Sequence, residues 1–192
     1  MRTTREEAAQ SRRRVVESAA RLFRARGTAA VGIAELMQAA GMTHGGFYKH
    51  FKSKDALVAE ACAFALAEGR ARLRRAAEGA RKGEELKAIV DSYLSEAHRK
   101  RIAKGCALAA LGGEAANPGS PLHGALAEGR ENFIALIAKY WTGPAARQHA
   151  AMLVSTMVGT LVTARLADPQ SGAELLRAAR LSLHRRLSPP KA

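Results

Sequence analysis

The stretch from residue 43 to residue 54 concentrates side chains that can hydrogen-bond to a polyanion. Phe47 and Phe51 stand four residues apart within it, which places both rings on one face of a short helix for packing. Other positions carry hydroxyl, imidazole and ammonium groups, on Thr43, His44, Tyr48, Lys49 and His50. Groups of these kinds bond to base edges and phosphate oxygens, so this stretch predicts a contact surface for DNA.

A second short helix must position that surface. Apolar side chains recur at i, i+3, i+4 and i+7, which is one face of a helix, at Ile33, Leu36, Met37 and Ala40. Gly41 ends this helix, because glycine adopts the left-handed conformation of a helix end at little steric cost. Two short helices joined by a glycine turn, with the second helix polar and basic outside, are typical of a helix-turn-helix.

Residues 41–57 carry a pattern more specific than a glycine turn. They read Gly-Met-Thr-x-Gly-Gly-Phe-Tyr-x-His-Phe-x-Ser-Lys-x-x-Leu. This pattern resembles the DNA-binding signature of the TetR family of bacterial regulators, and the resemblance extends over about residues 12–66. It implies an all-helical protein that binds DNA as a dimer through this N-terminal part.

Base contacts are expected at the start of the second helix. Thr43 and His44 stand there, where helix-turn-helix proteins touch base edges. Gly45 and Gly46 have no side chains, so the backbone can come close to DNA. The glycine pair also costs roughly 1 kcal/mol of helix stability per residue against alanine. A weak element that carries function is a common compromise at a binding site.

Phosphate contacts are expected from the rest of the second helix and from its flanks. By resemblance, Tyr48, His50 and Lys54 bond phosphates, while Lys49 reaches either bases or backbone. The first ten residues are expected to fray, after which the arginines at residues 12–14 open the first helix and suit phosphate contacts. The alternative for these arginines is a solvated helix start.

Two positions depart from the family pattern. Members commonly have Thr where this chain has Gly32, and often Arg where it has Ala34. Glycine is a tolerable N-cap, so the helix is expected to survive. A methyl group at Ala34 cannot bond a base edge, so more of the base reading must come from residues 43–49.

Composition favours helices and an anionic partner. Hydrophobic residues make up 47% of the 192 residues and aromatic residues 5%, which favours helix over sheet. Lys and Arg number 31 against 17 Asp and Glu, a net charge of +14, and the pI is near 10.7. Nucleic acid is the first partner that this excess indicates and a membrane surface the second; the alternative is an arginine-rich surface that serves solubility. The excess is +6 over residues 1–58 and +8 over residues 59–192, so charge alone does not locate a DNA site.

The remaining composition predicts a soluble cytoplasmic protein without membrane partners. Two cysteines, Cys62 and Cys106, cannot form a disulfide framework. No apolar run approaches the twenty or so residues of a membrane span, and the N-terminus lacks the apolar core of a signal peptide.

The chain after the helix-turn-helix reads as further helices. Apolar stripes run through residues 57–65, 86–94, 122–141, 153–164 and 175–187, with Gly and Pro between them. The last two stripes look like the helix pair that forms a four-helix dimer interface in TetR-like proteins. The prediction is an all-α homodimer, with a three-helix DNA-binding domain at residues 1–58 and a helical-bundle effector and dimerisation domain at residues 59–192.

A second resemblance surrounds Cys106. The motifs Tyr-Leu-Ser-x-x-His-Arg at residues 93–99 and Gly-Cys-x-Leu-Ala-x-Leu at residues 105–111 are similar to a TetR subgroup that senses electrophiles or oxidants through a cysteine. Four cations precede the thiol, at Arg99, Lys100, Arg101 and Lys104. These charges and a helix start near Gly105 would favour the reactive thiolate, which makes Cys106 a candidate switch. The alternative is an inert buried cysteine beside a basic surface.

Other chemistry finds little support in the sequence. The six histidines show no metal-ligand spacing, and there is no nucleophile elbow, phosphate-binding loop or suitable carboxylate pair, so neither an enzyme nor a cofactor is expected. We expect a regulator, most simply a repressor, that binds a palindromic double-stranded DNA operator with half-sites about 34 Å apart. It would be released by a small molecule or an electrophile. Two alternatives stay open: a helical enzyme for an anionic substrate, and a protein that binds nucleic acid without sequence preference.

Overall fold

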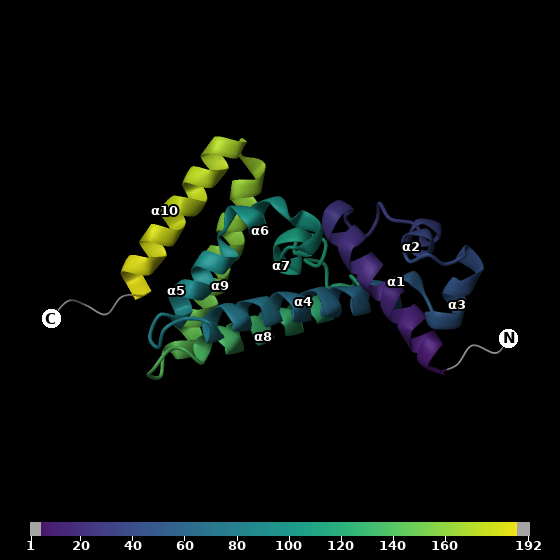
Figure 1. Cartoon of the computed structure of the whole chain (residues 1–192), viewed down its shortest axis with the longest axis horizontal. Helices are drawn as coiled ribbons and strands as arrows, with labels where there is room; N and C mark the ends of the chain where they lie inside the picture. Colours follow the sequence, from purple (N-terminus) through teal and green to yellow (C-terminus); the bar gives the residue numbers. More distant parts are fainter. Residues whose placement is uncertain (1–4, 188–192) are drawn as a thin grey trace.

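The computed structural model describes residues 5–187, and every regular element in that range is a helix (Figure 1). The prediction of an all-α fold is therefore confirmed. The N-terminal helices lie at one end of the molecule and the last helix at the other (Figure 1). The elements after the N-terminal three are α4 (Lys54–Glu78), α5 (Glu85–Tyr93), α6 (Glu96–Lys100), η2 (Ile102–Lys104), α7 (Ala107–Leu111), α8 (His123–Ala138), α9 (Ala146–Leu166) and α10 (Pro169–Leu187).

Three helices build the N-terminal head: α1 (Arg5–Arg26), α2 (Ile33–Ala39) and α3 (Phe47–His50). Each is too short or too polar to be stable alone, and each buries one apolar face in a shared core. The chain reverses after α1 and after α2 at glycines with positive φ, 81° at Gly27 and 70° at Gly41. The predicted role of Gly41 as a helix stop is confirmed.

The start of α1 differs from the prediction. Residues 5–10 are helical, and Glu6 and Glu7 in the first turn suit the positive end of the helix dipole. The expectation of a frayed segment is wrong for these residues, and residues 1–4 lie outside the described range. As a result, the arginines at residues 12–14 lie inside α1 and do not open it.

Helix α4 is the longest helix and joins the head to the rest of the protein. Ser53 caps its start, because the Ser53 side chain accepts a hydrogen bond from the backbone N–H of Ala56 at 3.1 Å. The helix runs unbroken across the predicted domain boundary between residues 58 and 59. Further along, α4 lies beside α8 (Figure 1), and Gly129 of α8 has no room for a side chain because Leu66 of α4 occupies that space.

The apolar interior forms two clusters that share α4. The first holds the cores of α1 to α3 and the N-terminal half of α4, together with Ala107, Leu111, Leu122 and Leu126. The second holds the C-terminal part of α4 with α5, α8, α9 and α10. Helix α7 thus contributes to the core of the head although it lies far beyond residue 58. The division into 1–58 and 59–192 stays a prediction.

Helix α9 is partly exposed within one chain. Its buried positions include Leu153, Met157 and Leu161, and the exposed side carries Met152 and Leu166. By length and composition alone α9 could cross a membrane, contrary to the expectation from the sequence, and 33% of its apolar window is buried in the fold. Core helices of soluble proteins pass the same test, so this observation is weak evidence for a membrane segment.

Candidate functional site

The polar residues of the predicted contact surface lie on the outside of the head. Thr43, His44 and Lys49 are exposed, and the Tyr48 side chain is 69% exposed, which is unusual for an aromatic ring. His50 is half-buried at the end of α3. Four hydrogen-bonding side chains therefore face solvent from one short segment of the head.

Phe47 and Phe51 hold this segment in place, as the sequence predicts. Their relative exposures are 0% and 3%, and their ring centroids lie 5.6 Å apart. The Tyr48 ring contacts Phe47 edge-on, with centroids 5.2 Å apart, so the exposed tyrosine rests on a buried phenylalanine. Burial of two large aromatic rings is the main force that fixes an α-helix of only four residues.

The contact segment starts differently from the predicted helix. Residues His44–Gly46 form the 3-10 turn η1, and the α-helix begins only at Phe47. The glycine pair explains the difference, since glycine disfavours the regular α-helix. Thr43 has extended backbone before the turn and makes no capping bond with its side chain, so its hydroxyl is not used for the helix start.

Arg12 has an internal role, contrary to the expected phosphate contact. Its guanidinium pairs through both terminal nitrogens with Glu60 of α4, and its Nε donates to the backbone carbonyl of His50 at 3.3 Å. The same group lies over the Phe51 ring, 4.7 Å from the centroid. Arg12 therefore joins α1, α3 and α4, and its contacts with His50 and Phe51 hold the end of the contact segment against the head.

Lys54 lies at the edge of the same surface. Its Nζ donates to the backbone carbonyl of Thr28, in the loop between α1 and α2, at 2.8 Å. An ammonium group has three protons, so this bond leaves two donors for another acceptor. The predicted phosphate contact of Lys54 stays a prediction.

A cavity of about 180 Å³ lies in the middle of the helical bundle. Its wall contains small and apolar side chains from α4, α7 and α8, among them Leu66, Leu108 and Phe133, together with Tyr93 and Cys106. Polar side chains also line it: Arg70, Arg72, Glu128 and Asn132. An apolar cavity of about 150 Å³ is known to hold a single aromatic ring, so this one is large enough for a small organic molecule.

Cys106 is the N-cap of α7 and is 8% exposed. Its backbone N–H donates to Nε2 of His98 at 3.0 Å, so Nδ1 of His98 carries the proton and donates to the carbonyl of Tyr93 at 2.6 Å. The helix that was expected to start near Gly105 starts at Ala107, and α7 is only five residues long. Cys106 is thus buried, as expected for an inert cysteine, and it also forms part of the cavity wall, as expected for a switch.

Burial changes the protonation of the groups around this cavity. It raises the pKa of the Cys62 thiol to about 12, so Cys62 is an unreactive thiol. It lowers the pKa of His98 to about 4, and the ring is neutral at physiological pH. Burial also raises the pKa of Tyr93 well above its ordinary value, and the neighbouring Cys106 thiol raises it further.

Two of the four cations before Cys106 are paired elsewhere. Arg99 and Lys100 both pair with Glu96 on their own helix, and hydrogen bonding to Arg99 lowers the pKa of Glu96. The cations that interact electrostatically with Cys106 are instead Arg24 of α1 and Arg165 of α9. The sequence did not indicate either of them, because both are far from Cys106 in the chain.

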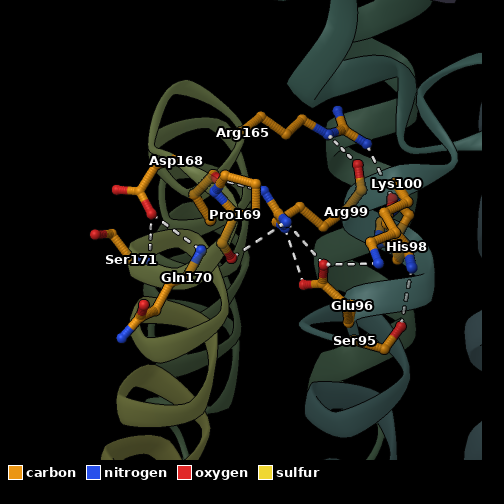
Figure 2. A network of polar contacts seen from close by, with 11 residues as sticks. Ser95, Glu96, His98, Arg99, Lys100, Arg165, Asp168, Pro169, Gln170 and Ser171 are labelled. Carbon is orange, nitrogen blue, oxygen red and sulfur yellow. Dashed lines mark hydrogen bonds and ion pairs between the residues drawn. The ribbon is translucent and has the colours of Figure 1, made fainter.

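Arg99 and Arg165 connect α6 to the end of α9 by reciprocal contacts (Figure 2). Arg165 donates through Nε to the carbonyl of Arg99 and through Nη2 to the carbonyl of His98, both at 3.2 Å. Arg99 donates through Nη1 to the carbonyl of Ala164 at 3.2 Å. Each guanidinium thus binds the backbone of the other helix, and the backbone of His98 cannot move without α9.

No group of three or more metal-ligating side chains comes together in the part of the chain that the structure describes. The polar groups present are hydrogen-bond donors on the surface of the head and a thiol, a phenol and an imidazole near the cavity. This arrangement is suited to binding.

Comparisons with known proteins point to one family. Residues 15–61 match the family described as "Bacterial regulatory proteins, tetR family". The chain is 40% identical over 78 residues to the HTH-type transcriptional regulator TtgR of Pseudomonas putida, a match that covers 41% of this chain and 37% of that protein. The curated relatives are therefore matched over less than half of their own length.

Solved structures match over nearly the whole chain. A TetR transcriptional regulator from Chloroflexus aurantiacus superposes with a TM-score of 0.79 at 25% identity, covering 93% of this chain and 94% of that one. The reduced form of Escherichia coli NemR superposes with a TM-score of 0.77 at 20% identity, covering 90% and 94%. At 20% identity, the similarity to NemR shows a shared fold and nothing about function.

The neutral His98 predicts a specific dependence of stability on pH. Below about pH 6.5 an unfolded imidazole binds a proton, whereas His98 in the fold stays neutral until the pH approaches 4. Stability is therefore complete above pH 6.5 and falls as the pH drops toward 4. Between pH 7 and pH 4.5 the free energy of unfolding should fall by about 2 kcal/mol more in the parent than in His98→Gln. Urea unfolding of both proteins at the two pH values measures this; parallel losses would contradict the assignment.

Proposed function

The chain belongs to the TetR family of bacterial regulatory proteins by its N-terminal domain, and we propose that it is a DNA-binding transcriptional regulator that acts on a palindromic operator. The observation that carries this proposal is the exposed set of hydrogen-bonding side chains on residues 43–49, fixed by two buried phenylalanines. The matched family is described as regulatory, and both TtgR and the Chloroflexus aurantiacus protein are named as transcriptional regulators, which argues against an enzyme.

Two kinds of DNA contact follow from where the side chains lie. Thr43 and His44 precede the helix, with exposed side chains and no capping bond, so they are free to meet base edges. Tyr48 and Lys49 lie on the exposed side of α3, with His50 at its end, where a phosphate backbone could pass. Gly45 adds no bulk to the surface, since a methyl group there would meet nothing within 4 Å of the chain, and DNA can approach the backbone.

A homodimer is the second part of the proposal. The exposed side of α9 carries Met152 and Leu166, which are 67% and 83% exposed, with small residues between them. Hydroxyls on this side bond back to carbonyls of their own helix, at 2.9 Å for both Thr156 and Thr163. Such a face presents apolar atoms without unsatisfied donors, which suits packing against a second copy.

Release by an effector is the third part. The cavity of about 180 Å³ fits a molecule of about one ring, and Cys106 is the only thiol in its wall among the described residues. We assign Cys106 as the group that an electrophile or oxidant modifies, because bulk added there must displace packed helices. A dimer whose two heads change spacing would then lose its operator.

The division between base and phosphate contacts can be measured once the operator is known. Duplexes selected from a random pool would define it. His44→Ala should flatten the preference among operator variants by about 1–3 kcal/mol at the contacted base pair, because a base contact is lost. Tyr48→Phe should weaken all sequences alike by about tenfold, because a phosphate contact carries no sequence information.

Lys54 and His50 complete this test. His50→Ala should weaken all duplexes alike, and Lys54→Ala should lower the slope of log affinity against log salt by about 0.9 for one lost phosphate contact. An unchanged slope would mean that Lys54 serves only its bond to Thr28. If Tyr48→Phe changed the relative affinities for operator variants and His44→Ala did not, the roles assigned to these two residues would be reversed.

The dimer is tested by Gly159→Arg on the exposed side of α9. Inside one chain a side chain at Gly159 meets nothing within 4 Å, so the fold of the single chain should tolerate the change. The dimer should be lost, and operator affinity should fall by about two orders of magnitude or more with the loss of bivalent binding. Mass in solution by light scattering measures the first effect. Gly124→Arg, also in open space but on α8, is the matched control; a dimer that survives Gly159→Arg would place the interface elsewhere.

The effector proposal is tested with a one-ring quinone. The parent and Cys62→Ser should be released from the operator after reaction, whereas Cys106→Ser should bind normally and ignore the reagent. Intact mass of each protein shows which thiol carries the adduct. Cys62 is a suitable control because its pKa of about 12 keeps it protonated. Equal release of parent and Cys106→Ser would exclude the cysteine and leave the cavity as a site for a reversible ligand.

A further inference from the structure

The backbone at Gly105 lies close to two guanidinium groups from different parts of the fold, one buried and one partly buried. Arg24 comes from α1 in the head, and its Nη1 donates to the carbonyl of Gly105 at 3.1 Å. Arg165 comes from α9, on the other side. A methyl group at Gly105 would lie 2.6 Å from Nη2 of Arg165, so only glycine allows this approach.

The buried Arg24 guanidinium donates hydrogen bonds through all three of its nitrogen atoms. Its side chain is 1% exposed, and besides Gly105 it binds the carbonyl of Ala20 at 2.8 Å and the carboxylate of Glu68 at 3.2 Å. A buried cation needs all its partners, because water cannot replace one that moves away. The position of the Gly105 carbonyl and the position of α1 are therefore linked through Arg24.

The other side of the segment is tied to α6 and α9. The N–H of Cys106, the next residue, donates to His98, and the carbonyl of His98 accepts from Arg165. The residue that follows Gly105 also forms part of the cavity wall. One short stretch of backbone is thus connected to the cavity, to α9 and to the head.

A second contact reaches the head from beyond the far end of α7. The Glu114 carboxylate accepts hydrogen bonds from the backbone N–H of Thr28 at 3.1 Å and from its hydroxyl at 2.5 Å. Helix α7 lies between Gly105 and Glu114, and a short helix moves as a unit. The Glu114 contact is exposed, however, so it is weaker than the buried one at Arg24.

We propose that Gly105 and Arg24 form the relay between the cavity and the DNA-binding head, with Arg24 as the positioning residue that transmits a displacement of the Gly105–Cys106 backbone to α1. This proposal rests on the proposed function, since it supplies the route by which an occupied cavity or a modified Cys106 alters the head. It adds that the route passes through a single buried cation rather than along α4 alone. Coupling between two sites is reciprocal, so DNA on the head must also change the Gly105 segment.

Hydrogen exchange with and without DNA tests the relay and requires no effector. The parent is mixed with its selected operator or with a random duplex, and amide exchange is followed in a peptide that covers residues 105–111. The operator should slow exchange there by about fivefold or more, the lower end of measured couplings. In Arg24→Met the operator should produce no such change, even at DNA concentrations that saturate the variant. Arg24→Lys, which keeps the charge, should restore part of the effect.

Arg26→Met is the matched control, because Arg26 lies on the same turn of α1 but pairs with Glu35 within the head. It should behave like the parent. Gly105→Ala tests the relay at the carbonyl that Arg24 binds. It also serves as the remaining test if Arg24→Met does not fold. Its methyl group must displace Arg165, so operator affinity should fall about fivefold or more with no reagent present.

The outcomes separate the relay from the function. A parent that binds no duplex rejects both. Operator binding that slows exchange equally in the parent and in Arg24→Met rejects the relay alone, as does parental affinity in Gly105→Ala. Loss of the operator effect in Arg24→Met supports the relay even if quinone fails to release the parent, in which case only the role of Cys106 is wrong.

Discussion

The burial of one continuous helix in two hydrophobic clusters is the constraint on which the rest of the structure depends. Helix α4 packs Leu57, Val58 and Ala61 into the core of the head and Leu73 and Ala77 into the core of the bundle. A 25-residue helix is a stiff rod about 37 Å long. Head and bundle therefore cannot reorient independently, and any change in one must be accommodated along α4 or across the contacts beside it.

The contacts beside α4 that join head and bundle are hydrogen bonds of polar groups buried or partly buried among apolar side chains. Arg24 is buried, Arg165 is partly buried, and both bind backbone carbonyls, while His98 is neutral and uses both ring nitrogens. Hydrogen bonds are stronger in such surroundings, and an unpaired group is correspondingly expensive, so only a few backbone arrangements are compatible with full pairing. Packing alone tolerates small shifts, whereas these groups favour one arrangement. These pairing requirements would give the proposed release from DNA its physical basis, since intermediate arrangements would leave buried groups unpaired.

The proposed DNA-contacting surface obtains its stability from the core beneath it and not from its own hydrogen bonds. Its base-contacting candidates, Thr43 and His44, lie on a non-α turn with little intrinsic stability, and the stability comes from Phe47 and Phe51 underneath. The large net charge of +14 is not concentrated there. Several cations of the head, Arg12 and Arg26 among them, hold the head together through ion pairs. Under the proposed function, the overall charge would draw the protein to DNA in general, and the few exposed groups would serve recognition.

The sequence by itself determined what depends on short distances along the chain. The helical stripes, the turn at Gly41, the cap at Ser53 and the inward rings of Phe47 and Phe51 were all readable, because propensity, capping and periodicity act within about one to two helical turns. Only the tertiary structure decided which cations serve which purpose. Arg12 meets Glu60 across 48 residues and Arg24 meets Gly105 across 81, and no local pattern records such pairs. The cavity beside Cys106 has the same origin, since its walls come from four separate parts of the chain and exist only once the two cores have closed around α4.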